Sequence, residues 1–540
     1  MRRVVFVVAA SSALLLMSST AGATTDRQQA ATVASHGDPF GSCLAIGADS
    51  FGVNYPDTEL EPWVAANPAN RRNLIGSYQQ DRWFDGGAKG LVAAYSFNSG
   101  QSWKSVPLPF SECGASFYGG NVLHYDRASD PWNSIGKDGI AYAVSISFSN
   151  NGDNAVGAAR SVDGGRTWTN QQAITAADFT VFYDKESVTA DPNVPGTAYV
   201  VWDTAYAAPC PPGPRSKSPT MNNRIRTSRE RPTVGSAANH AAGPAAAAAA
   251  DCFFQPTFFS RTTDGGVHWE TPRPIAATAP DEATLGNIIV INRQTGALYN
   301  FFSHFDITGA ATVELVISTD RGNTWSDSQV VSNEDAVSIY DPRNHFLTAR
   351  AGDIISPAID PNSGQLYVAW EDGRFNGHLN DQAVISTSQT GMGGSWSAPS
   401  QISPPGDPGA FNPTIEVNAL GQVGAIFYDI RNLKPSTPAS VLPTDTWFRR
   451  TDGPGVAFGH EEHLGSYNIL MAPVAFGGFF VGDYEGLVAQ QDNSFLAFFS
   501  QSTCADVSCP ASGNGIGAPT HAPDPQDIFA STIGDQVGQH

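Results

Sequence analysis

The chain has 540 residues, of which 15% are charged, and its formal net charge is −21. This charge would repel nucleic acids and anionic membrane surfaces at long range, so it excludes both as general partners. The length exceeds that of a usual single hydrophobic core, which predicts either several domains or one domain built from repeats.

The N-terminal segment MRRVVFVVAASSALLLMSSTAGA has the layout of a secretory signal peptide. Two arginines precede an apolar stretch from Val4 to Met17, and small residues end the segment at Ala23. The apolar stretch is shorter than the roughly 20 residues that span a bilayer, and no later segment is long enough. We therefore expect residues 1–23 to be cleaved and the protein to be exported, with no membrane partner.

Six cysteines fit an oxidising compartment, and they allow fifteen disulfide pairings that the sequence cannot resolve. The pairs favoured by spacing are Cys210 with Cys252 and Cys504 with Cys509. A zinc site is disfavoured because the chain has no CxxC pair. No metal or other cofactor is predicted, since no D-x-D-x-D-G calcium loop is present either.

After an N-terminal extension over 24–55, a pattern of strand, turn and strand recurs seven times, and the absence of long helical periodicity predicts an all-β chain. The seven units begin at Glu61, Asp130, Lys185, Gly286, Ile355, Asn412 and Gly482.

An octapeptide follows most of these units. Its copies are SFNSGQSW from Ser96, SVDGGRTW from Ser161, TTDGGVHW from Thr262 and STDRGNTW from Ser318, with altered copies from Ser386 and near Thr451. Ser and Asp oxygens can accept hydrogen bonds in a tight turn, Gly supplies a positive φ, and Trp packs back on the strands. We interpret the octapeptide as a folding device rather than a catalytic signature.

Two segments break the repeat. Residues 207–251 contain PPGPRSKSP, scattered arginines and AAGPAAAAAAD, which predict a flexible insertion. Residues 504–540 form a Gly- and Pro-rich tail in which Asp527 to Ile533 could supply a last strand.

The octapeptides resemble the Asp-box, or bacterial neuraminidase repeat, of sialidases and related β-propellers. The resemblance implies a propeller of four-stranded blades over 56–503, with seven blades favoured and six as the alternative, since the seventh unit lacks an octapeptide and could close the ring with N-terminal residues. The motif also occurs in propellers that are not sialidases, so it indicates the fold more strongly than the activity.

Because antiparallel strands alternate in direction, the ends of second strands share a face with the entries of first strands, opposite the octapeptides. Acid and base residues gather on this face. They are Asp81-Arg82, Asp372 and Arg374, and Asp429 and Arg431 at strand ends, with Glu59, Glu61, Lys185, Glu186 and Asp483-Tyr484-Glu485 at the entries.

This inventory suits glycoside cleavage, which pairs a carboxylic acid with a nucleophile or base. The resemblance to exo-α-sialidases implies that Arg82, Arg374 and Arg431 clamp a sugar carboxylate, with Asp372 and Asp429 beside them. It further implies Asp81 as proton donor, Tyr484 as nucleophile and Glu485 as its base, with Asp483 adjacent. The Phe- or Tyr-Arg-Ile-Pro stretch that opens sialidases is absent from this chain.

The predicted function is therefore a secreted, monomeric glycoside hydrolase resembling exo-α-sialidases, with a glycan as its partner. Two alternatives stay open: a non-catalytic propeller that binds glycans or proteins, and a seven-bladed glycosidase of neutral polysaccharide. Three arginines that converge in one pocket would favour an acidic sugar as the substrate. Two carboxylates across an open cleft, without these arginines, would favour a neutral polysaccharide. Asp–Arg pairs that only neutralise each other would be structural.

Four tryptophans are candidate platforms on which a sugar could stack: Trp83, Trp132, Trp202 and Trp370. For Trp202 and Trp370 a packing role is favoured. The segment His460-Glu461-Glu462-His463 is one residue short of HExxH and is expected to be a solvated loop.

Overall fold

The computed structural model describes residues 31–43, 54–118, 123–211, 251–349, 354–388, 394–475, 478–502 and 526–534. The predicted signal peptide, most of the predicted insertion and the Cys504 and Cys509 pair lie outside these ranges. Within them the regular secondary structure is almost entirely β-strand, as predicted; helices are limited to α1 (Glu112–Ala115) and two 3₁₀ turns, Gly373–Phe375 and Ile469–Met471. None of the described helices is long and apolar enough to cross a membrane.

In the described part of the chain, seven consecutive groups of four antiparallel strands, here called sets, follow one another. The first three sets are β2 (Glu59–Ala66), β3 (Leu74–Arg82), β4 (Ala88–Ser96) and β5 (Lys104–Pro107); β6 (Arg127–Ile135), β7 (Ala141–Phe148), β8 (Asn154–Ser161) and β9 (Thr169–Ala177); and β10 (Val181–Ala190), β11 (Ala198–Pro209), β13 (Thr257–Thr262) and β14 (Arg273–Ala276). An extra strand, β12 (Asp251–Gln255), pairs with the end of β11 and runs parallel to the start of the fourth set.

The remaining four sets continue in chain order. They are β15 (Glu282–Ile291), β16 (Leu298–Phe305), β17 (Ala311–Ser318) and β18 (Gln329–Glu334); β21 (Ser356–Ile359), β22 (Leu366–Asp372), β23 (Gln382–Thr387) and β24 (Ser400–Gln401); β25 (Ala410–Val417), β26 (Val423–Asp429), β27 (Pro443–Thr451) and β28 (Phe458–Asn468); and β31 (Gly486–Ala489), β32 (Phe495–Ser502), β33 (Gln526–Ile533) and β1 (Thr32–Val33). The strands of the described chain pair into six sheets, two of which are larger because the pairings β4–β6 and β12–β15 each join two neighbouring sets.

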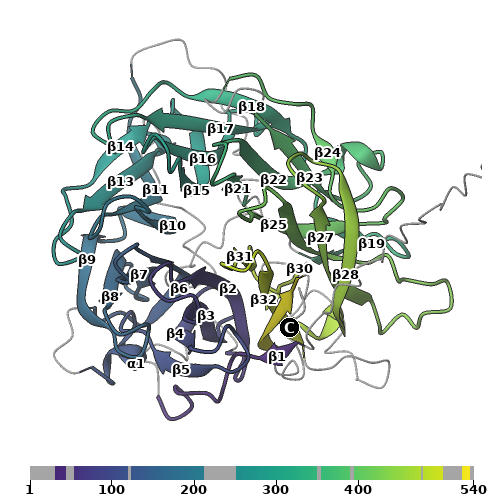
Figure 1. The fold of residues 1–540 in the computed structure, drawn as a ribbon, viewed down its shortest axis with the longest axis horizontal. Coiled ribbons are helices and arrows are strands. Elements are labelled where there is room, and N and C mark those ends of the chain that lie inside the picture. The colour runs from purple at the N-terminus through teal and green to yellow at the C-terminus, as the bar shows by residue number, and fades with distance from the viewer. Residues whose placement is uncertain are drawn as a thin grey trace, which may run out of the picture.

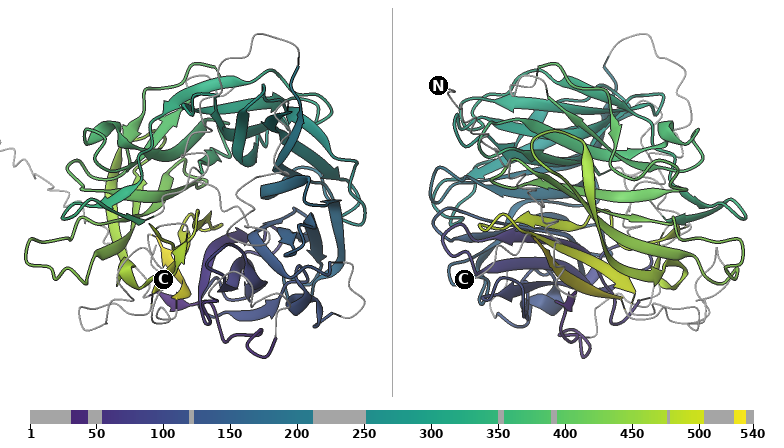
Figure 2. Two further views of the ribbon diagram at one scale, coloured as in Figure 1. Left: turned by 180° about the vertical axis from the view of Figure 1, so that it is seen from behind. Right: turned by 45° about the vertical axis from the view of Figure 1, so that its right-hand side comes forward.

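The seven sets form a ring, seen down its axis in Figure 1 and from two further directions in Figure 2. The first strand of each set contacts the first strand of the next, and β31 of the last set contacts β2 of the first. The last set joins both ends of the chain, because Thr32 pairs with Ala530. The ring therefore takes in strands from the predicted extension and tail, outside the predicted limits of 56–503.

The octapeptides lie between the third and fourth strands, at the face where first strands end, which we call the octapeptide face. In SVDGGRTW, Asp163 accepts hydrogen bonds from the N–H groups of Arg166 (3.1 Å) and Thr167 (3.0 Å), and Ser161 accepts one from Gly165 (3.0 Å). Trp168 is buried and packs against residues of the preceding set such as Ile75. These contacts close and anchor the turn, in agreement with the predicted folding role of the octapeptide.

Polar side chains of the preceding set also hold the octapeptide turns. Asn73 donates to the carbonyl of Gly164 (3.0 Å), and Arg160 donates to that of Gly265 (2.9 Å). The turns therefore fasten neighbouring sets together in addition to closing their own hairpins.

Two disulfides hold the outer parts of the described chain. The predicted bond between Cys210 and Cys252 is confirmed. Cys43 bonds with Cys113, a pair that spacing did not indicate, and this bond ties the N-terminal extension to α1.

The opposite face, where first strands begin, is called the entry face. A small sheet covers part of it, made of β19 (Ile339–Asp341), β20 (Phe346–Ala349), β29 (Val474–Ala475) and β30 (Gly478–Phe479). β19 and β20 come from the connection before the fifth set, and β29 and β30 from the connection before the seventh set. Phe480 is the residue directly after β30. Phe480 lies against the guanidinium of Arg82, 4.4 Å from ring centroid to Cζ.

Candidate functional site

Five of the first strands contain a β-bulge near the entry face, each centred on a residue with left-handed φ. These residues are Glu61 (φ 53°), Asp130 (55°), Lys185 (48°), Gly286 (72°) and Asn412 (49°). A left-handed backbone costs a residue other than glycine of order 1–3 kcal/mol, and such strain concentrates at functional sites. Three of the five residues are ionisable, so the repeated bulge places ionisable side chains at equivalent points of the ring.

These bulges create a buried charged group, here called the axial cluster: Glu61, Asp130, Lys185, Glu186 and Tyr484. The Nζ of Lys185 lies 3.3 Å from Oδ1 of Asp130 and 3.5 Å from the ring centroid of Tyr484. The hydroxyl of Tyr484 donates to the carbonyl of Pro131 (3.2 Å). One cation therefore touches both an acid and the aromatic ring.

Glu61 is fully buried and accepts a hydrogen bond from the side-chain amide of Gln79. Gln79 in turn accepts from Nη1 of Arg82 (2.9 Å). Burial, reinforced by the charges of Asp130 and Asp483, raises the pKa of Glu61 to about 8. Glu61 is consequently protonated at neutral pH.

Glu186 is also fully buried, and neither of its carboxyl oxygens has a hydrogen-bond partner within the described ranges. Burial raises its pKa well above the ordinary value, as it does for the phenol of Tyr484. Asp130 is the more accessible acid, with its side chain 10% exposed. A hollow of about 10 Å³, enough for one water molecule, borders Asp130 and Asp184.

Asp81, the predicted proton donor, has its contacts outside the axial cluster. Its carboxylate forms an ion pair with Lys89 (2.8 Å) and accepts a hydrogen bond from the N–H of Asp57 (3.0 Å). The contact with Asp57 holds the segment that precedes β2, and the ion pair with Lys89 joins Asp81 to β4. Asp483, in contrast, is close enough to Glu61 for its charge to raise the Glu61 pKa.

Arg374 and Asp372 neutralise each other at the end of β22. Nε and Nη2 of Arg374 each lie 2.6 Å from a different carboxylate oxygen of Asp372, and Nη2 also donates to the carbonyl of Asn333 (2.6 Å). This two-pronged pair occupies the face of the guanidinium that would otherwise bind a ligand carboxylate.

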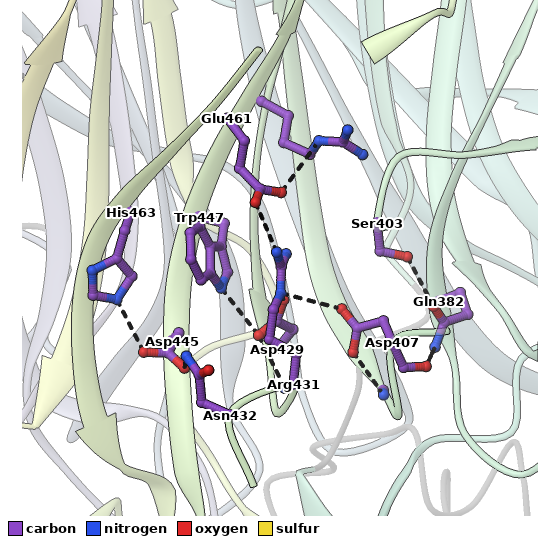
Figure 3. A network of polar contacts seen from close by, with 12 residues as sticks. Gln382, Ser403, Asp407, Asp429, Arg431, Asn432, Asp445, Trp447, Glu461 and His463 are labelled. Atoms are coloured by element: carbon purple, nitrogen blue, oxygen red, sulfur yellow. Dashed lines mark hydrogen bonds and ion pairs between the residues drawn. The ribbon is translucent and has the colours of Figure 1, made fainter. Parts of the chain in front are cut away.

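Arg431 lies among three carboxylates at the end of β26, as Figure 3 shows. It donates to Asp429 and to Glu461 (2.9 Å), and its Nε is 3.7 Å from Asp407. Burial and the neighbouring Asp407 raise the pKa of Asp429 to about 9, so Asp429 holds a proton between the two acids. Arg82, Arg374 and Arg431 therefore each have their own partners, and the side chains that hold them belong to three different strand sets.

Tyr484 and Glu485 belong to different networks, because consecutive residues of an extended segment point to opposite sides. Glu485 accepts a hydrogen bond from the N–H of Ser500 (2.9 Å), and Tyr428 lies beside it with its hydroxyl donating to the carbonyl of Ser500 (2.6 Å). Burial raises the pKa of Glu485 well above its ordinary value. The acids near Tyr484 are instead Glu61, Asp130, Glu186 and Asp483.

The segment from His460 to His463 is part of strand β28, so the expected solvated loop is wrong. Nε2 of His463 lies 3.0 Å from both Asp445 and Ser466. A Ser-His-Asp triad needs the acid and the serine on different ring nitrogens, so this trio lacks triad geometry. Among the described residues no group of three His, Cys, Asp or Glu side chains is arranged to hold a metal ion.

The four candidate aromatic platforms are all buried, with at most 4% of each side chain exposed. Trp202 and Trp370 pack in the core, which is the role favoured for them from the sequence. Trp132 stacks on Trp63, with ring centroids 3.6 Å apart. In the described structure these indoles serve packing.

Sequence reasoning placed Glu61, Lys185, Glu186 and Tyr484 on the correct face but overlooked Asp130, which it treated only as the start of a weak repeat copy. The available signal was an acid followed by Pro-Trp, which occurs at Glu61 and again at Asp130. Asp407 and Glu461, the partners of Arg431, carried no such signal because their contacts join distant loops and strands.

No family model and no curated protein matches the chain. Solved structures with similarity include the Hadza microbial sialidase Hz136, with 14% identity, a TM-score of 0.42 and coverage of 79% of this chain and 73% of that one. The NanB sialidase from Streptococcus pneumoniae has 9% identity, a TM-score of 0.43 and coverage of 94% and 98%. The Penicillium chrysogenum α-L-arabinanase has 8% identity, a TM-score of 0.39 and coverage of 89% and 97%. At these values the similarity assigns no activity, so the function is argued from the geometry of the site.

Proposed function

We propose that this protein is a secreted glycoside hydrolase on a seven-bladed β-propeller of the Asp-box class, with the axial cluster as its catalytic centre. The blade count rests on the seven four-stranded sets and on the contacts between their first strands. Export rests on the N-terminal segment and fits the two disulfides, which form in oxidising compartments. The protein acts as a monomer on a glycan substrate.

One observation carries the catalytic proposal: two neighbouring carboxyl groups of the axial cluster differ in their surroundings. Glu61 is buried, with a pKa raised to about 8, whereas Asp130 is paired with the ammonium of Lys185. Glycosidases need this division between a protonated acid and a second carboxylate. In our proposal Glu61 protonates the leaving glycosidic oxygen, and Asp130 attacks the anomeric carbon or deprotonates the attacking water.

The arginines favour a neutral sugar over an acidic one. Arg374 is paired with Asp372, and Arg431 with Asp429 and Glu461, so part of each guanidinium is already occupied by protein carboxyl groups, which disfavours a clamp on a sugar carboxylate. An exo-α-sialidase would use Tyr484 as its nucleophile, and here the acids near that phenol are Glu61, Asp130, Glu186 and Asp483 rather than Glu485. Sialosides therefore stand as the second substrate class.

The test is hydrolysis of a panel of fluorogenic glycosides, including arabinofuranosides, pyranosides and a sialoside, by the purified protein. Glu61→Gln should lower kcat by ~10²–10⁴-fold, the usual contribution of a general acid. Asp191→Asn is the matched control, since it changes a buried acid beyond the other end of β10 and should leave kcat unchanged. If the wild-type protein hydrolyses the sialoside and Tyr484→Phe abolishes this hydrolysis, the protein is a sialidase with Tyr484 as its nucleophile.

A non-catalytic binding propeller is the second candidate, and the complete burial of Glu61 and Glu186 favours it. Absence of turnover of every glycoside by folded protein, combined with saturable glycan binding, would select this candidate and refute the hydrolase.

A further inference from the structure

The axis of the ring contains a channel of about 360 Å³ that leads to the octapeptide face. Its lining continues past the ends of the first strands, where Pro68, Pro192 and Pro361 surround the mouth. A volume of this size lies within the range of small-molecule sites, which are largely apolar with a few polar groups.

The channel is lined mostly by apolar residues. Its walls include Val64, Val188, Ile288, Ala358 and Val488, one from each of five first strands. Its inner end is formed by the stacked indoles of Trp63 and Trp132, and Tyr484 packs on Trp132, with ring centroids 5.1 Å apart. An apolar chain that enters from the octapeptide face would therefore end against aromatic rings.

Three ionisable residues line the channel. Lys137 and Arg293 lie at the mouth, beyond the ends of β6 and β15, and Glu416 is the second-last residue of β25, level with Ala358 and Val488. Lys137 donates to the carbonyl of Asn193 (3.3 Å), and one carboxyl oxygen of Glu416 accepts from the N–H of Val417 (2.9 Å). Burial raises the pKa of Glu416 to about 7. Two cations thus face one acid that becomes neutral below that pH, which makes the mouth attractive to an anion despite the net charge of −21.

We propose that this channel binds one unbranched apolar carboxylate of medium length, with its chain against Trp63 and Trp132 and its carboxylate beside Arg293 and Lys137. The length follows from the strand: Trp63 and Pro68 are five positions apart, about 16 Å at ~3.3 Å per residue. An extended chain of roughly ten carbons is shorter than this distance and fits within it. The channel borders the axial cluster through Trp132, on which Tyr484 packs, but the proposal does not depend on the proposed hydrolase.

The probe is decanoate, and its binding is measured by isothermal titration calorimetry and by the quenching of tryptophan fluorescence. We expect saturable binding of one decanoate per chain, with butyrate and decylamine each binding at least ~10-fold more weakly because one is too short and the other carries the wrong charge. Arg293→Ala should weaken decanoate ~10-fold, in line with the loss of a charge-assisted contact. Arg321→Ala, which removes an exposed arginine from an octapeptide turn outside the channel, should change nothing.

The pH dependence gives an independent check. Lys137 and Arg293 are the other charged residues of the lining, and the lining residues of the adjacent strands β21 and β31 are uncharged. Deprotonation of Glu416 places a negative charge near the ligand, so decanoate should bind ~10-fold more weakly at pH 8 than at pH 6, and Glu416→Gln should remove this change. Absence of decanoate binding, equal affinity for decylamine, or an unchanged affinity in folded Arg293→Ala would each overturn the proposal.

Discussion

Glu61 provides the most informative stability experiment, because its protonation in the folded protein also underlies the catalytic proposal. Its pKa is raised from the ordinary 4.5 to about 8. The folded state therefore holds a proton that the unfolded chain releases between these two pH values. The stability linked to this proton is fully present below pH 4.5 and is lost as the pH rises to about 8.

At about 1.4 kcal/mol per unit, the full window corresponds to a loss of at most about 5 kcal/mol, and the interval from pH 5 to 7 to about 3 kcal/mol. Gln keeps the shape and can still accept the hydrogen bond from Gln79, but it does not titrate. The free energy of unfolding of Glu61→Gln relative to wild type should therefore rise by about 3 kcal/mol between pH 5 and 7.

Urea unfolding followed by tryptophan fluorescence at pH 5, 6, 7 and 8 measures this difference directly. Glu112→Gln changes an exposed acid at the start of α1 and serves as the surface control. Parallel profiles for wild type and Glu61→Gln across this range would refute the protonation of buried Glu61.

Three further predictions concern the architecture and are checked by the same unfolding assay. Asp163→Ala removes the acceptor of two backbone N–H groups in an octapeptide turn and should cost about 1–2 kcal/mol, whereas Asp163→Asn, which keeps an acceptor oxygen, should cost less; equal losses would contradict the role of this oxygen as the acceptor. Gly76→Ala would place a Cβ 2.3 Å from the ring of Phe498, where the first and last sets meet, and should cost at least about 1–3 kcal/mol, while Gly453→Ala meets nothing within 4 Å and should be neutral. A Gly76→Ala variant as stable as Gly453→Ala would argue against this closure of the ring. Replacing both Cys43 and Cys113 by Ser opens a loop with a sequence separation of 70 and should cost about 4 kcal/mol by loop entropy, and an unchanged unfolding midpoint would exclude a structural role for the bond.

The repeat made the fold accessible from the sequence. Each strand unit and each octapeptide encodes a local hairpin, and local patterns such as the alternation around Ser161–Trp168 depend only on neighbouring residues. The expected contribution of N-terminal residues and of the tail to the last set is confirmed, but the sequence did not indicate Thr32–Val33 in particular, because two residues carry no pattern of their own.

The site was less accessible for a physical reason. Strand direction correctly assigned Glu61, Lys185 and Tyr484 to one face, but the contacts that decide their chemistry depend on bulges and on long-range packing. The Asp–Arg motifs at Asp372 and Asp429 gave the same signal as a substrate clamp, and only the geometry shows their arginines held by aspartates. The separation of Tyr484 from Glu485 follows from the alternation of an extended chain and could have been anticipated.

The dependence of the Glu61→Gln defect on the leaving group tests the catalytic claim most directly. A general acid matters when the leaving oxygen needs a proton, so on the best substrate of the panel Glu61→Gln should lose ~10²-fold or more with an alkyl or sugar leaving group and little with a dinitrophenyl leaving group. Equal losses with both leaving groups, or unchanged turnover with the sugar leaving group, would contradict the assignment of Glu61 as the acid.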